Sequence, residues 1–194
     1  MQTRRLMVIV FTVLMLATGS LFAADYVVDS KGMHASINFR IKHLGYSWLT
    51  GRFNKFEGIF SFDENNVSAT KIVIDIDPAS VDTNHAERDK HLREGDFLEV
   101  KKYPIAKFVS TRVEALGEGE AIIHGDLTLH GVTKSIAIKA NAVGGGPDPW
   151  GGYRQGFSGV TKIALKDFGI DFDLGPASTD VEFDLQIEGV RQGG

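Results

Sequence analysis

Apolar and polar residues alternate with a period of two over most of the chain beyond residue 35. In one segment, Ile37, Phe39, Ile41 and His43 share one face, whereas the residues between them share the other. Such alternation is typical of a β-strand that buries one face. Comparable segments follow at 56–62, 71–77, 106–111, 123–130, 136–142, 157–165 and 181–188. The pattern therefore predicts about eight strands, each with one apolar face.

Short polar segments separate these strands. Residues 63–66 (DENN) form a predicted turn, Pro78 ends a strand, and His130-Gly131 begins a tight connection. Residues 144–149 (GGGPDP) have the composition of a loop. Short connections between consecutive strands favour antiparallel pairing throughout.

One apolar face per strand implies a single interior. Antiparallel strands in this number can close into a barrel, which removes the unpaired edges of the sheet. A sandwich of two sheets fits the same alternation. We expect an all-β fold, and the alternation leaves barrel and sandwich open.

The predicted inward positions mix large aromatic residues with very small ones. The aromatic set comprises Phe39, Phe60, Phe108, Phe157 and Phe183, and the small set comprises Gly58, Ala106, Gly125, Ala140 and Gly159. Glycine has no side chain with which to fill a core, so these positions either leave a lumen or ease the curvature of the sheet. A fully packed interior is the alternative.

The segment 83–95 (TNHAERDKHLREG) lacks the period of two. Asn84 is a candidate helix cap with Glu87 three residues later, and Gly95 suits a helix end. His85 and His91 are six residues apart, which places them about 120° apart around a helix. They therefore cannot both bind one metal ion, and we expect a short surface helix over residues 84–95 without a metal.

The N-terminal residues have the pattern of a secretory signal peptide. Arg4 and Arg5 precede an apolar run at 6–17, and small residues follow. We expect cleavage after Ala23, or alternatively after Ala24. Residues 1–23 would then be the signal peptide and residues 24–194 a single exported domain.

Charge and cysteine content exclude several classes of function. Removing two arginines leaves 19 basic residues against 25 acidic ones, a formal charge of −6. Such a surface argues against nucleic acid as a partner. The chain has no cysteine, which excludes disulfides, thiolate catalysis and Cys-bound zinc or iron–sulfur clusters. We expect no cofactor.

Catalytic motifs are equally scarce. The sequence has no GxSxG elbow, and the glycines at 144–146 precede a proline and not a helix. His124 and His130 fall on polar strand faces, where we expect them to be exposed. His43 shares an apolar face and is the only histidine predicted to point inward. One inward histidine is too little for acid–base catalysis, so we expect no enzyme.

Several motifs occur together in a fixed order. They are HLGYSWLTGRF (43–53), SVDTNHAERDKHLR (80–93), DFL (96–98), KYP (102–104), GDLTLHGVTK (125–134), DPWGGYRQGF (148–157), KDFGID (166–171) and DLGPAS (173–178). In these motifs the chain resembles the YceI-like family of periplasmic, lipocalin-like proteins. The resemblance covers essentially the whole chain after the signal peptide.

The resemblance implies an eight-stranded antiparallel lipocalin-like barrel with an apolar interior and a periplasmic location. It also implies binding of a polyisoprenoid or a similar amphiphilic lipid, such as a polyprenyl phosphate or a quinone with an isoprenoid tail. It implies no known catalytic centre. The 84–95 helix would frame the mouth of the barrel, anchored by Leu92 and Phe97.

We predict that the ligand contacts residues on the inward strand faces and one tryptophan from the resemblance motifs. These are Ile37, Phe39, Ile41, His43, Trp48, Phe60, Ile74, Phe108, Leu127, Leu129, Ile138, Phe157 and Phe183. A membrane or membrane protein as lipid donor or acceptor, and a homodimer, are further partners to consider. The alternative functions are an enzyme acting on an isoprenoid or quinone-type substrate, and a packed barrel that serves as a stress or interaction protein.

Overall fold

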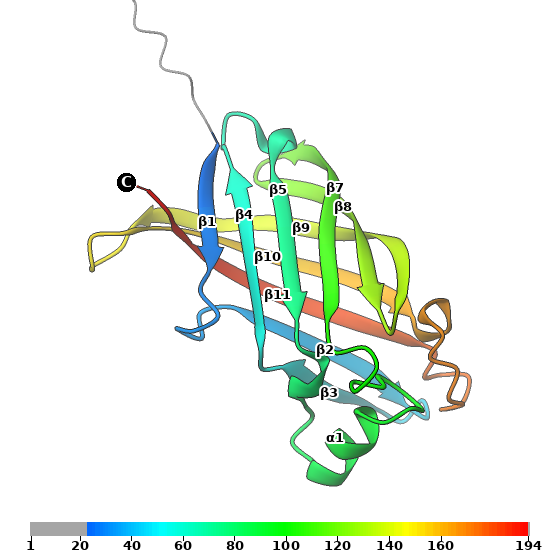
Figure 1. Cartoon of the computed structure of the whole chain (residues 1–194). Helices are drawn as coiled ribbons and strands as arrows, with labels where there is room; N and C mark the ends of the chain where they lie inside the picture. Colours follow the sequence, from blue (N-terminus) through cyan, green and yellow to red (C-terminus); the bar gives the residue numbers. More distant parts are fainter. Residues whose placement is uncertain (1–22, 194) are drawn as a thin grey trace, which may run out of the picture.

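The computed structural model describes residues 23–193, so residues 1–22 of the predicted signal peptide lie outside the described residues. Figure 1 shows one sheet wrapped around a central axis, with a short helix at its lower end. The strands are β1 Ala24–Val28, β2 Ser36–His43, β3 Ser47–Phe53, β4 Phe56–Phe62, β5 Lys71–Ile76, β6 Val81–Asp82, β7 Ala106–Gly117, β8 Glu120–Leu129, β9 Val132–Pro147, β10 Tyr153–Ala164 and β11 Asp180–Arg191. The helices are α1 Ala86–Leu92 and three 3₁₀ turns, η1 Val67–Ala69, η2 Pro78–Ser80 and η3 Leu165–Phe168.

Eight strands close into an antiparallel barrel. The hydrogen-bonded order is β1-β4-β5-β7-β8-β9-β10-β11, and β11 pairs with β1 to complete the ring. Closure leaves this ring without a free edge, as the barrel interpretation predicts. The sandwich alternative is therefore wrong.

The remaining three strands extend the barrel at one end. β11 pairs with β1 through residues 189–191 and with β2 through residues 181–186. β1 and β2 therefore lie one after the other along the same edge of β11. β3 pairs with β2, and β6 with β3. In Figure 1 this extension leads to α1, whereas the β7–β8 turn lies at the opposite end. We call these the α1 end and the β7–β8 end.

Buried apolar side chains form two connected groups along the barrel. The larger group includes the stacked rings of Tyr26 and Phe60, whose centroids are 4.8 Å apart. The second group lies toward the α1 end and is centred on Phe168, which is 1% exposed. The inward faces predicted from the alternation supply most members of both groups. Apolar burial on these faces is the main stabilising contribution to the barrel.

The predicted loop at 144–149 is largely strand. β9 continues to Pro147, and Gly145 and Gly146 pair with Gln155 and Arg154 of β10. The buried Gln155 side chain occupies the place where a Cβ on Gly145 would lie, and it donates to the Gly144 carbonyl (3.0 Å). The glycines thus make room for a neighbouring side chain and do not break the strand, which is why their composition was misleading.

Helix α1 is shorter than predicted and is capped by a different residue. His85, and not Asn84, precedes the first turn, and its Nδ1 accepts the Arg88 backbone N–H (3.2 Å). Asp89 and Arg93 are four residues apart but do not serve as a local ion pair. Asp89 accepts the backbone N–H and the hydroxyl of Thr83, while Arg93 donates to backbone carbonyls at 79 and 81. Both side chains therefore fasten α1 to the segment before it.

Within residues 23–193, none of the helices is both long and apolar enough to cross a membrane.

Candidate ligand-binding cavity

An apolar cavity of about 960 Å³ occupies the interior of the barrel. Its wall is formed by the inward faces of the strands, together with α1 and the segment after η3. Twelve of the thirteen predicted ligand contacts lie on this wall: Ile37, Phe39, Ile41, His43, Phe60, Ile74, Phe108, Leu127, Leu129, Ile138, Phe157 and Phe183. The packed-barrel alternative does not fit a bore of this size.

Trp48 is the exception, and its predicted place on the wall is wrong. It lies on β3 opposite Lys42 and is 42% exposed. Its ring packs under the Arg40 guanidinium, 4.5 Å from the ring centroid, on the outer face of the barrel. The β3 residues that point inward and line the cavity are Leu49 and Phe53. Alternation within β3 therefore places Trp48 on the outside.

The prediction also missed residues of the wall. Several belong to the same strand faces and could have been found by extending the alternation: Ile72, Ile76, Ile123, Ile136, Val181 and Leu185. Others come from segments without a strand pattern: Leu44, Arg88, His91, Phe172 and Leu174. No periodic signal in the sequence marks this second group, because its position depends on how α1 and the segment after η3 pack onto the barrel.

Aromatic rings lie against glycines of the wall. A Cβ added at Gly125 would overlap the Phe108 ring, and one at Gly51 would overlap the Phe39 ring. Each ring therefore takes space at the wall that a side chain would otherwise occupy. This arrangement holds large apolar residues flat against the sheet and leaves the centre of the bore open. The predicted small inward residues thus act partly by accommodating rings.

Helix α1 and the segment after η3 meet across one end of the cavity. The His91 ring is 5.0 Å from Phe97 and 5.7 Å from Phe172, and Phe97 and Phe172 are 5.0 Å apart. Leu92 and the buried Phe97 also face the cavity. Helix α1 therefore stands at a mouth of the barrel with Leu92 and Phe97 as apolar contacts, which matches the expectation for this segment.

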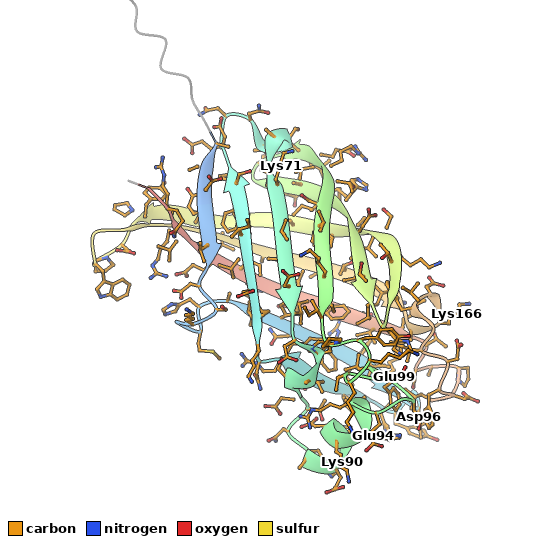
Figure 2. All side chains as sticks on the ribbon, viewed as in Figure 1. Lys71, Lys90, Glu94, Asp96, Glu99 and Lys166 are labelled. Carbon is orange, nitrogen blue, oxygen red and sulfur yellow. The ribbon has the colours of Figure 1, made fainter. Side chains whose placement is uncertain are left out.

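Charged residues of the wall gather at the two ends of the cavity. Arg88 lies at the α1 end, together with His43, His91 and Asp173. Lys42 borders the same end, but its ammonium lies over Trp48 on the outer face. The β7–β8 end is acidic and contributes Glu64, Glu118 and Glu120. Figure 2 shows Lys71 at this acidic end, but Lys71 lies on the outer face of β5 and is not part of the wall. Between the ends the wall is formed almost entirely by apolar side chains.

The histidines differ in their surroundings. His43 lies at the exposed rim of the α1 end. His124 is partly buried beside Arg112. His130, predicted to be exposed, retains only 13% of its side-chain exposure. Its ring packs on Tyr103 at 4.7 Å, and its Nδ1 lies 3.1 Å from the Phe168 carbonyl oxygen. The turn at His130-Gly131 folds this ring back onto the barrel, so its position on a polar strand face did not predict its burial.

A separate polar cluster on the barrel surface is centred on Arg154. Its guanidinium donates to Asp29 at 2.6 Å and also to Glu188 and Asp148. Hydrogen bonds from Arg154 and His34 hold the pKa of Asp29 at about 2, below its usual 3.8. Asp29, His34 and Glu188 have the spacing of a metal site. The Arg154 guanidinium already supplies the positive charge there, so we assign no metal to this cluster.

Comparisons with known proteins agree with this architecture. A UPF0312 protein of Pseudomonas aeruginosa strain LESB58 is 62% identical over 174 residues, which cover 90% of this chain and 91% of the relative. The crystal structure of a Campylobacter jejuni YCEI protein is 31% identical, covers 79% of this chain and 91% of that chain, and superposes with a TM-score of 0.70. A polyisoprenoid binding domain from Saccharophagus degradans shares the fold at 19% identity, with a TM-score of 0.64 over 87% of this chain and 99% of that domain. The YceI-like domain model matches residues 26–189, and the chain therefore belongs to the YceI-like domain family.

Proposed function

We propose that the barrel binds one elongated amphiphilic lipid with an isoprenoid-like tail inside its cavity. The observation that carries this proposal is the apolar bore of about 960 Å³ whose charged residues lie only at the two ends. Pockets for organic ligands are mostly apolar with a few polar groups that fix orientation. The cavity has the same combination of an apolar wall and a few polar groups, and its polar groups lie at the two ends of the barrel axis.

The volume suits a long tail. A water-sized group takes up about 30 Å³ of liquid volume, so 960 Å³ has room for roughly thirty carbon-sized groups. That number corresponds to roughly six five-carbon isoprenoid units. Each buried methylene stabilises the complex by about 0.8 kcal/mol before the costs of association are subtracted. A tail that fills the bore would therefore bind tightly.

The comparisons support the ligand class without identifying the ligand. The Saccharophagus degradans neighbour is described as a polyisoprenoid binding domain. The chain shares its fold and its family with YceI-like proteins. A polyisoprenoid or an isoprenoid-tailed quinone is accordingly the first class to test on this protein.

We further propose that the protein acts in the periplasm, in transport, storage or sensing of the lipid. The motif at residues 1–23 supports export, and an apolar tail needs an enclosing wall to remain dissolved in an aqueous compartment. A membrane or membrane protein would donate or accept the lipid. The acidic surface suits a soluble carrier.

Catalysis on the same lipid is the weaker candidate. Acid–base chemistry needs titratable groups that converge on the reacting atoms. Here the charged wall residues lie at opposite ends of the cavity, and the wall between them is apolar. This separation favours binding over turnover, so we propose no enzymatic reaction.

Two adjacent isoleucines of β8 provide a matched test. Ile123 lines the cavity, whereas Ile122 points to the outer face. Ile123→Trp should fill part of the bore and weaken geranylgeraniol binding about tenfold or more, whereas Ile122→Trp should bind like the wild type. Equilibrium binding with a labelled alcohol measures the effect, and circular dichroism checks that both variants fold. Equal affinities for all three proteins would refute binding in the bore.

A further inference from the structure

The two ends of the cavity differ in chemistry. Among the described wall residues, Arg88 is the permanent cation that faces the cavity, at the α1 end. Lys42 also borders this end, but its ammonium lies over the Trp48 ring (5.5 Å) on the outer face. Three of the four carboxylates on this wall lie at the β7–β8 end, and Asp173 lies at the α1 end. A long ligand inside the bore therefore meets positive charge at one end and negative charge at the other.

Arg88 is held in place by a buried polar network. Its Nε donates to the Thr83 hydroxyl oxygen and its Nη2 to the Thr83 carbonyl, both at 2.8 Å. The Thr83 hydroxyl in turn donates to Asp89. Thr83 and Asp89 are 6% and 7% exposed. Two buried residues thus fix one edge of the guanidinium while the side chain forms part of the cavity wall.

The other groups at this end add donors around the same mouth. His43 ends β2 at the exposed rim. His91 lies one helical turn from Arg88, and its Nε2 is 3.1 Å from Asp96. Figure 2 shows Lys90, Glu94 and Asp96 around the exposed side of α1, where both signs of charge occur.

We propose that the α1 end is a binding site for an anionic head group, a phosphate or a carboxylate. The lipid would enter the bore with its head at Arg88 and its tail directed toward the β7–β8 turn. A guanidinium fixed in place is well suited to anionic oxygens, and the three glutamates disfavour the reverse orientation. This inference rests on the proposed lipid-binding function and adds the class and the orientation of the ligand.

Three ligands with one tail separate the contribution of the head group. Geranylgeranyl monophosphate, geranylgeranoic acid and geranylgeraniol carry a phosphate, a carboxylate and a neutral hydroxyl on the same chain. We expect the wild type to bind at least one of the two anions about tenfold or more tightly than the alcohol at low ionic strength. Added salt should reduce this preference and leave alcohol binding nearly constant.

Arg88→Gln removes the charge and keeps an amide that can donate to Thr83. It should abolish the preference for the anions over geranylgeraniol, measured as the ratio of the affinities within the same variant. Arg88→Lys should restore part of the preference. Lys139→Gln, an exposed change on the outer face of β9, serves as the charge-matched control and should keep the full preference. If Arg88→Gln does not fold, the salt dependence of the wild-type preference provides the second test.

The outcomes separate this inference from the proposed function. Equal wild-type affinity for the alcohol and both anions would overturn the head-group site and leave lipid binding intact. A preference that survives in Arg88→Gln, or one that added salt does not reduce in the wild type, would also overturn it. Failure of all three ligands to bind the wild type would refute both proposals. Preference for only one anion would support the site and identify the head group as phosphate or carboxylate.

Discussion

Glycines and aromatic rings act as pairs in the barrel wall. Gly125 and Phe108 lie on neighbouring strands, and so do Gly51 and Phe39, with each ring placed where a glycine Cβ would lie. An aromatic ring over a glycine recovers packing that the glycine alone would lose. The same contact keeps the ring out of the centre of the bore. Adding a Cβ at either glycine should thus change both the stability of the fold and the shape of the cavity.

Substitution of Gly125 by alanine tests this pairing. The new methyl would overlap the Phe108 ring and approach the Val109 carbonyl oxygen to 2.6 Å, so one of them must shift. We expect a loss of about 1–3 kcal/mol in the free energy of unfolding, measured by urea denaturation. Gly144→Ala is the matched control, since a Cβ there meets nothing within 4 Å, and it should change stability by less than about 0.5 kcal/mol. Equal effects of the two substitutions would contradict the pairing.

The Asp29–Arg154 pair predicts a pH-dependent contribution to stability. The pKa of Asp29 is about 2 in the folded protein and 3.8 when unperturbed, so the folded state favours the carboxylate. This contribution is complete above pH 3.8 and is lost as the pH falls through about 2. Asp29→Asn should therefore cost about 2 kcal/mol near neutral pH and progressively less below pH 3.8. Asp25→Asn, an exposed change on β1, should have little effect at either pH.

Thermal unfolding from pH 6 to pH 2 measures both variants against the wild type. A difference between wild type and Asp29→Asn that stays constant down to pH 2 would show that the pair does not stabilise the fold by this charge interaction.

Helix α1 is an element whose position depends on contacts outside itself. Its seven residues are too few for an isolated helix to be stable in water. Asp89 and Arg93 fasten it to Thr83 and to backbone carbonyls near β6. These contacts set the place of Arg88 and His91 at the cavity mouth. The element therefore couples the edge of the barrel to the proposed head-group site.

Thr83→Val tests this coupling. Valine keeps the shape of the side chain but removes the hydroxyl that links Asp89 and Arg88. The buried carboxylate loses one of its two donors from Thr83, which should cost about 1–3 kcal/mol. Hydrogen exchange should rise in α1 and stay unchanged in β8 and β9. Thr111→Val, an exposed change on β7, is the control and should leave hydrogen exchange in α1 unchanged. The same rate of exchange in α1 in both variants would contradict the role of Thr83.

At the scale of the whole molecule, the sequence predicted the barrel and most of its inner face. The period of two was enough to place residues such as Phe108 and Leu127, because one interior receives one face of every strand. Trp48 lies on the outside because β3 alternates like the other strands and directs Leu49 and Phe53 inward. Arg88 and His91 could not be found this way, since their position depends on tertiary contacts of α1. The strand conformation at Gly145 could not be predicted locally either, because it depends on the side chain of Gln155, its partner on β10.

The central claim is that the bore holds one elongated apolar ligand. Native mass spectrometry of protein produced with its signal peptide, followed by solvent extraction of any bound mass, tests this claim most directly. We predict one discrete isoprenoid-like lipid at near one-to-one stoichiometry. Protein without an adduct, which also gains no mass after incubation with polyprenyl phosphates, isoprenoid quinones and geranylgeraniol, would contradict it.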